Sequence, residues 1–156
     1  MRTFLTLLIM ALLLPLGGAE AQTTFKRCFS AKEIEVEQLV RHGIFMREAA
    51  KNCEKTTPGV GKSWSEFDSK FAAKLKSQTD RRTKIFQREF KDRELQVRTY
   101  YDGRLVTYHR NESVTAAYCE NIERMLGDLT KKGWGAFAKQ AKLVQNEVQL
   151  DIKQCP

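Results

Sequence analysis

Residues 63–90 read SWSEFDSKFAAKLKSQTDRRTKIFQREF, and the apolar residues in this stretch recur at helical spacing. Those that lie four positions apart are Phe67, Phe71 and Leu75, followed by Phe86 and Phe90. Side chains at this spacing share one face of an α-helix. Ser63 and Glu66 have the spacing of a capping box, in which the two side chains satisfy free amides at a helix start. We therefore expect a helix that begins at Ser63 and ends within residues 91–94.

The segment before this helix carries a similar start signal. Ser30 and Glu33 form another capping box, which predicts a helix that reaches Cys53. Residues 56–61, TTPGVG, combine a proline with two glycines and end the helical pattern.

The apolar residues of the segments toward the C-terminus also recur at helical spacing. From Ser113 the apolar residues follow helical spacing, and residues 131–133, Lys-Lys-Gly, supply the basic last turn and glycine stop of a helix C-terminus. A last helix is expected from Trp134 toward Gln154.

Residues 95–109 fit two structures. Asp102-Gly103 is a two-residue turn that hairpins prefer, and valine, threonine and tyrosine around it favour strands. The same segment also fits a helical stripe through Val97, Tyr101 and Leu105. A lone two-stranded ribbon is only marginally stable, which favours the helix. The sequence therefore predicts an all-α bundle of four or five helices, stapled by disulfides, with a short β-hairpin near 95–109 as the alternative.

The N-terminal residues 1–21 have the pattern of a secretory signal peptide. Arg2 precedes an apolar run over residues 4–16, and Ala19 and Ala21 occupy the positions that a signal peptidase reads. The run is shorter than the roughly 20 residues needed to span a membrane. We expect a single helical domain over residues 22–156, exported to the periplasm or secreted, with no membrane span.

Export makes the four cysteines candidates for two disulfides, because bridges persist in oxidising compartments. A helix between Cys28 and Cys53 would hold them far more than about 7 Å apart, which excludes a bridge between them. Two connectivities remain, and antiparallel first and last helices favour Cys28–Cys155 with Cys53–Cys119.

Positive charge is concentrated on the helix over residues 63–90. The chain has 27 Lys and Arg against 19 Asp and Glu, a formal net charge of +8. Six cations fall at steps of three, four or seven residues and form one row, which we call the basic ridge: Lys70, Lys74, Arg81, Lys84, Arg88 and Lys91. Such a row would attract an extended polyanion or an anionic surface. A solvated helix face that keeps the protein in solution is the alternative.

Three polar residues interrupt the apolar face of the same helix, between its patches at residues 64–75 and 85–90. They are Gln78, Arg82 and Glu89. A buried arginine needs a carboxylate partner, and the candidates from other helices are Glu120, Glu123 and Glu147. The three residues are a candidate polar cavity for a small ligand. A tilted helix whose polar groups reach solvent is the alternative.

The sequence lacks the motifs of most cofactor sites. His42 and His109 are the only histidines, and no H-E-x-x-H, C-x-x-C or phosphate-binding glycine motif is present. We therefore expect no metal, haem or nucleotide cofactor, and we assign no catalytic residue.

These observations favour an exported, non-enzymatic binding or accessory protein. Its basic ridge would dock an anionic partner such as lipid headgroups, an acidic polysaccharide or an acidic protein. A nucleic acid fits the charge but meets an exported protein less often. The alternatives are a cell-envelope hydrolase with a site around Arg82, Glu89 and residues 100–109, and a periplasmic stress chaperone with an apolar groove.

Overall fold

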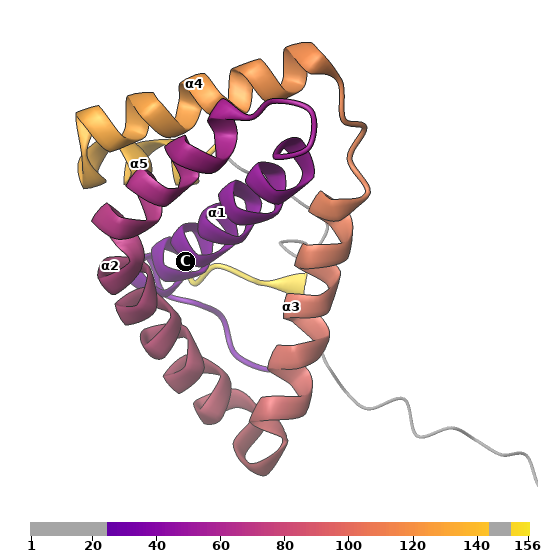
Figure 1. Cartoon of the computed structure of the whole chain (residues 1–156). Helices are drawn as coiled ribbons and strands as arrows, with labels where there is room; N and C mark the ends of the chain where they lie inside the picture. Colours follow the sequence, from indigo (N-terminus) through magenta and orange to yellow (C-terminus); the bar gives the residue numbers. More distant parts are fainter. Residues whose placement is uncertain (1–24, 144–150) are drawn as a thin grey trace, which may run out of the picture.

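The computed structural model describes residues 25–143 and 151–156. The predicted signal peptide over residues 1–21 lies outside these ranges. The helices are α1 (Ala31–Cys53), α2 (Gly59–Phe90), α3 (Glu94–Arg110), α4 (Ala116–Lys132) and the short α5 (Trp134–Ala141). Figure 1 shows α1 in the middle of the molecule, with α2 and α3 on either side and α4 across one end. The predicted all-α, disulfide-stapled bundle is confirmed.

The start of α1 is the one predicted from the sequence. The Ser30 hydroxyl accepts a hydrogen bond from the Glu33 amide at 3.4 Å, and a Glu33 carboxylate oxygen accepts one from the Ser30 amide at 2.8 Å. The helix then ends at Cys53, as expected. This capping box fixes where α1 begins.

The start of α2 is four residues earlier than predicted. Pro58 occupies the N-cap with a φ of −58°, a value that suits the first turn of a helix. Val60 is fully buried and extends the apolar face by one turn. Ser63 therefore lies inside the helix, and its predicted capping role is wrong. The helix ends at Phe90, and Lys91 begins a short 3₁₀ turn, Lys91–Arg93, with a φ of 49°.

Residues 95–109 lie within α3, so the hairpin alternative is wrong. Val97, Tyr101, Leu105 and His109 are buried at successive steps of four residues. This stripe packs against α1 and α2. All of its apolar residues lie on one face of a helix, whereas in a hairpin they would be divided between two faces. Asp102 and Gly103, which suggested the turn, are ordinary helical positions.

The chain after α5 differs from the predicted last helix. α5 ends at Ala141, and Ile152, Lys153 and Gln154 are not helical. Instead, the Phe29 amide donates to the Lys153 carbonyl at 2.7 Å, and the Cys155 amide donates to the Phe29 carbonyl at 2.8 Å. The predicted helix beyond Ala141 is wrong at residues 152–154, because this short extended pairing takes their backbone groups.

Both disulfides have the predicted pairing. Cys28–Cys155 and Cys53–Cys119 have Cα–Cα distances of 4.9 and 5.3 Å. The second bridge joins the end of α1 to the first turn of α4. The first bridge forms because the two extended ends of the chain pair, not because two antiparallel helices meet.

The two apolar patches of α2 enter two separate hydrophobic clusters. Phe67 and Phe71 pack with α1, α4 and Phe137 of α5. Phe86 and Phe90 belong to a cluster with α1, α3 and the N-terminal segment. The buried charged side chains of α1 and α2 are Glu37, Arg41, Glu48 and Arg82. The Arg82 guanidinium lies 4.7 Å from the centre of the Phe86 ring, which belongs to the second cluster.

Candidate functional site: the basic ridge of α2

The structure places the basic ridge on one continuous helix surface. Five of its residues lie on α2, and Lys91 follows immediately after the helix. All six side chains are exposed. From Lys70 to Arg88 the row is about 27 Å long, at 1.5 Å per residue. The predicted row of cations is therefore open to a partner.

Arg88 differs from the other members of the ridge because acidic neighbours already pair with it. It contacts the carboxylate of Glu33 on α1 and lies 2.8 Å from that of Glu89. The other five cations have no carboxylate within 4.0 Å among residues 25–143 and 151–156. Their charge is thus available at the surface, while that of Arg88 is largely neutralised.

Two ridge lysines are positioned by contacts with other helices. The Lys70 ammonium donates to the Thr130 carbonyl near the end of α4, and the Lys74 ammonium lies 5.6 Å from the centre of the Trp134 ring on α5. Lys131 follows Thr130 and is exposed. The first end of the ridge thus lies against the last turn of α4, a contact that the sequence analysis missed because the two segments are distant in the chain.

Arg82 is buried, and its partners are not the predicted ones. Its Nε lies 2.7 Å from a carboxylate oxygen of Glu37 on α1, and its Nη1 donates to Asp102 on α3. Glu120 and Glu123 are on α4, which packs against the other half of α2, and Glu147 lies outside the described residues. Burial alone would lower the pKa of Arg82, but the two carboxylates raise it above its ordinary value. Arg82 therefore stays charged.

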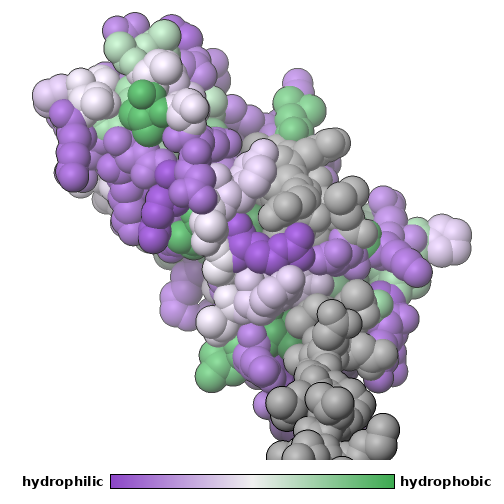
Figure 2. All heavy atoms as spheres, turned by 90° about the vertical axis from the view of Figure 1, so that its right-hand side faces the viewer, coloured by the Kyte–Doolittle hydropathy of each residue, from purple (hydrophilic) through white to green (hydrophobic). Residues whose placement is uncertain are grey.

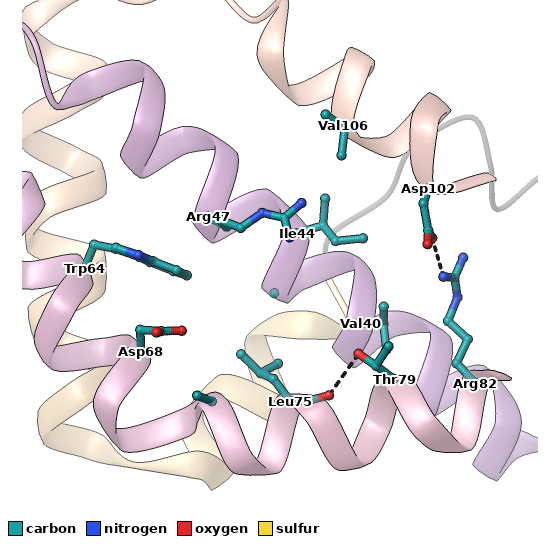
Figure 3. A pocket seen from close by; sticks show the side chains of 12 residues that line it. Val40, Ile44, Arg47, Trp64, Asp68, Leu75, Thr79, Arg82, Asp102 and Val106 are labelled. Atoms are coloured by element: carbon teal, nitrogen blue, oxygen red, sulfur yellow. Dashed lines mark hydrogen bonds and ion pairs between the residues drawn. The ribbon is translucent and has the colours of Figure 1, made fainter. Parts of the chain in front are cut away.

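The structure does not bring Gln78, Arg82 and Glu89 around one cavity. The Gln78 amide oxygen accepts from Arg81 at 3.2 Å, and Glu89 accepts from Arg88 and from the Arg27 amide. Of the three, only Arg82 lines the cavity of about 290 Å³ that lies between α1, α2 and α3 (Figure 3). The predicted cavity lined by all three residues is therefore not formed, and the observed cavity has mostly apolar walls.

The two histidines lie on either side of one phenylalanine. The ring centres of His42 and His109 are 5.7 and 5.1 Å from that of Phe45. Both histidines are buried. Burial lowers the pKa of His42 to about 4, so its imidazole is neutral at neutral pH. Among the described residues, no cluster of three or more His, Cys, Asp and Glu side chains has a geometry that suits a metal ion.

The residues named for a hydrolase site are also dispersed. Arg82 is held by Glu37 and Asp102, Glu89 faces the N-terminal segment, and His109 is buried beside Phe45. These groups do not converge on one point of the surface. Their roles in the structure are ion pairing and packing.

No helix in the described part of the chain is both long and apolar enough to cross a membrane. Figure 2 shows that the face turned toward the viewer, on the α3 side of the molecule, is mostly hydrophilic with scattered apolar residues. Comparison of the chain with protein-family models, curated proteins and solved structures found no match.

Proposed function

We propose that this protein is an exported, non-enzymatic binding protein whose basic ridge docks an anionic partner. The observation that carries the proposal is the row of five exposed cations that lack a carboxylate partner in the described structure. One exposed ion pair contributes less than about 1 kcal/mol. Several aligned pairs with one partner act together, so a partner with repeated negative charges would bind much more tightly than a single anion.

The shape of the ridge favours a linear polyanion, and we propose an acidic polysaccharide. The cations lie in a single row, which matches a chain with charges along its length better than a flat lipid surface. Membrane-binding surfaces usually add apolar side chains that insert between lipids. The large apolar residues that are exposed in the described structure lie elsewhere: Leu95, Tyr100, Tyr108, Val114 and Leu143.

The two disulfides support the exported location. Such bridges are typical of secreted and periplasmic proteins and are rare in the reducing cytosol. The apolar N-terminal segment, residues 1–21, has the sequence pattern of a signal that directs export.

Binding to polygalacturonate, a linear carboxylated polysaccharide, tests the proposal across a series of salt concentrations. We expect binding that weakens as salt rises, because docking releases counterions from the polyanion. The ridge variant Arg81→Glu/Lys84→Glu should weaken binding by about tenfold or more. The matched control, Lys55→Glu/Lys62→Glu, has the same net charge, with Lys62 about 28 Å along the helix axis from Arg81.

Comparison of the two variants distinguishes binding at the basic ridge from an effect of net charge alone. Equal losses in the two variants would mean that only net charge matters and would contradict the ridge as the docking site. Binding to vesicles that contain phosphatidylglycerol, with none to the polysaccharide, would replace the proposed partner by a lipid surface. Circular dichroism of each variant verifies that the helices are retained.

A further inference from the structure

The cavity beside Arg82 is built from one stripe of each of three helices. Val40 and Ile44 come from α1, Trp64 and Leu75 from α2, and Val106 from α3 (Figure 3). Its volume of about 290 Å³ is close to the lower end of small-molecule sites. These side chains give the cavity apolar walls, which suit the hydrocarbon body of a ligand.

Acidic groups stand at the two ends of the cavity. Asp68 lies one helical turn after Trp64 on α2, and Asp102 lies beside Arg82 at the other end (Figure 3). Thr79 is also in the lining, and its hydroxyl donates to the Leu75 carbonyl at 3.0 Å, so only its acceptor lone pairs remain.

Both arginines of the cavity are already paired. Arg82 donates to Glu37 and Asp102, and the Arg47 Nε lies 2.8 Å from a carboxylate oxygen of Glu48. Glu37 and Asp102 offset the charge of Arg82, which is a fixed part of the wall. Glu48 also pairs with Lys51 and Arg110, so Arg47 keeps part of its positive charge.

The acidic groups, in contrast, retain open acceptor sites. Asp68 is exposed and has no ion pair or hydrogen bond among the described residues. Asp102 accepts from Arg82 through one oxygen, and its other oxygen lies 3.9 Å from Arg98, beyond hydrogen-bond distance. The Asp102 side chain is 33% exposed. Asp68 at one end and Asp102 at the other therefore both offer open hydrogen-bond acceptors to a ligand.

We propose that this cavity binds a small organic amine with an apolar body. The ammonium group would be met by the Asp68 carboxylate and by the face of the Trp64 ring, which attracts cations through its quadrupole. The apolar body would lie along Val40, Ile44 and Leu75. This inference is independent of the docking function, since its ligand has the opposite charge and its residues are not on the basic ridge.

Three probes with the same phenyl body test the ligand class by calorimetry: phenethylamine, 2-phenylethanol and 3-phenylpropionate. We expect phenethylamine to bind with an affinity of about millimolar or tighter, given its few atoms. The alcohol should bind about threefold to fivefold more weakly, and the carboxylate more weakly still. Equal affinities, or tighter binding of the carboxylate, would overturn the proposal.

Two pairs of variants locate the site. Ala72→Phe fills the cavity from its exposed rim, whereas Ala73→Phe places the same side chain at an exposed position outside the lining. We expect phenethylamine binding to disappear only in the first. Asp68→Asn should weaken binding about threefold to fivefold, and Asp80→Asn should leave it unchanged. No binding by the wild-type chain, or equal effects within either pair, would show that this cavity is not an amine site.

Discussion

Arg82 of α2 and Glu37 of α1 form an ion pair in which the side chains are only 1% and 2% exposed, with 2.7 Å between Nε and Oε2. The Arg82 guanidinium also lies 4.7 Å from the centre of the Phe86 ring, so the pair borders the second hydrophobic cluster. A second carboxylate, Asp102 of α3, completes the bonding of the arginine. One arginine of α2 therefore links α1 and α3 through its two carboxylate partners.

Removal of one member of this pair should be strongly destabilising. We expect Glu37→Gln to lower the free energy of unfolding by about 3 kcal/mol or more, because it leaves buried positive charge on Arg82 and Arg41. The double variant Glu37→Leu/Arg82→Met should recover only part of the loss, since it removes the charge of Arg82 but leaves Arg41 buried without its carboxylate. Urea denaturation measures both effects. As a control, Lys76→Ala breaks an exposed pair with Asp80 and should change stability by less than about 1 kcal/mol.

The two disulfides should differ in their resistance to reduction. Cys53 and Cys119 are both fully buried, whereas Cys28 is exposed. A thiolate can attack only a sulfur that it reaches, so mild reduction should open Cys28–Cys155 first. Alkylation and mass spectrometry at successive times give the order. Simultaneous loss of both bridges would mean that the protein unfolds globally before either bridge is reduced.

The free energy of unfolding should fall as the pH is lowered through the range in which His42 titrates. Its pKa is about 4 in the folded protein and about 6.5 when exposed, because burial disfavours the charged imidazole. Between these values the unfolded chain binds a proton that the folded chain does not, so acidification favours unfolding. We expect the free energy of unfolding to decrease by about 3 kcal/mol between pH 6.5 and pH 4.

A substitution of His42 separates its contribution to the pH dependence of stability from that of other titrating groups. His42→Gln removes the titrating group, so stability should depend less on pH across the same window, whatever its absolute value. His109 lies nearby and its pKa is also lowered, chiefly by burial, so part of the dependence should persist. An unchanged pH profile in His42→Gln would contradict the assignment to His42.

Two glycines offer a matched test of backbone strain. Gly133 has a φ of 85° at the end of α4, a conformation that L-residues rarely adopt, and a Cβ there would meet no atom within 4 Å. Because its ψ is −176°, this conformation is nearly exclusive to glycine, and we expect Gly133→Ala to lower the free energy of unfolding by about 1–3 kcal/mol. Gly127 lies inside α4, where an added Cβ also meets nothing. Gly127→Ala should instead stabilise the protein by about 0.5–1 kcal/mol, as thermal denaturation would show.

Much of the helical architecture could be predicted from short-range sequence patterns. The Ser30–Glu33 capping box, the apolar repeat of α2 and the Gly133 stop act over one or two turns, and each is found in the structure. Patterns of this kind involve residues that are close together in the sequence, so they can be recognised without knowledge of the tertiary structure. A rigid helix between Cys28 and Cys53 excludes their bridge and leaves two possible pairings. The choice between these two depended on the pairing of the extended chain ends at Phe29 and Cys155.

Other features depended on which helices pack together. Residues 95–109 have local preferences for both strand and helix, and contact of Val97, Tyr101 and Leu105 with the second hydrophobic cluster favoured the helix. The partners of Arg82 are far from it in sequence, since Glu37 is 45 and Asp102 is 20 residues away. The cation row could be predicted, but its contact with α4 at Thr130 and the location of the cavity required the tertiary structure. Local sequence determined where cations and apolar residues lie on each helix, and only packing determined which of them meet, because burial and pairing energies depend on neighbours that the chain brings together when it folds.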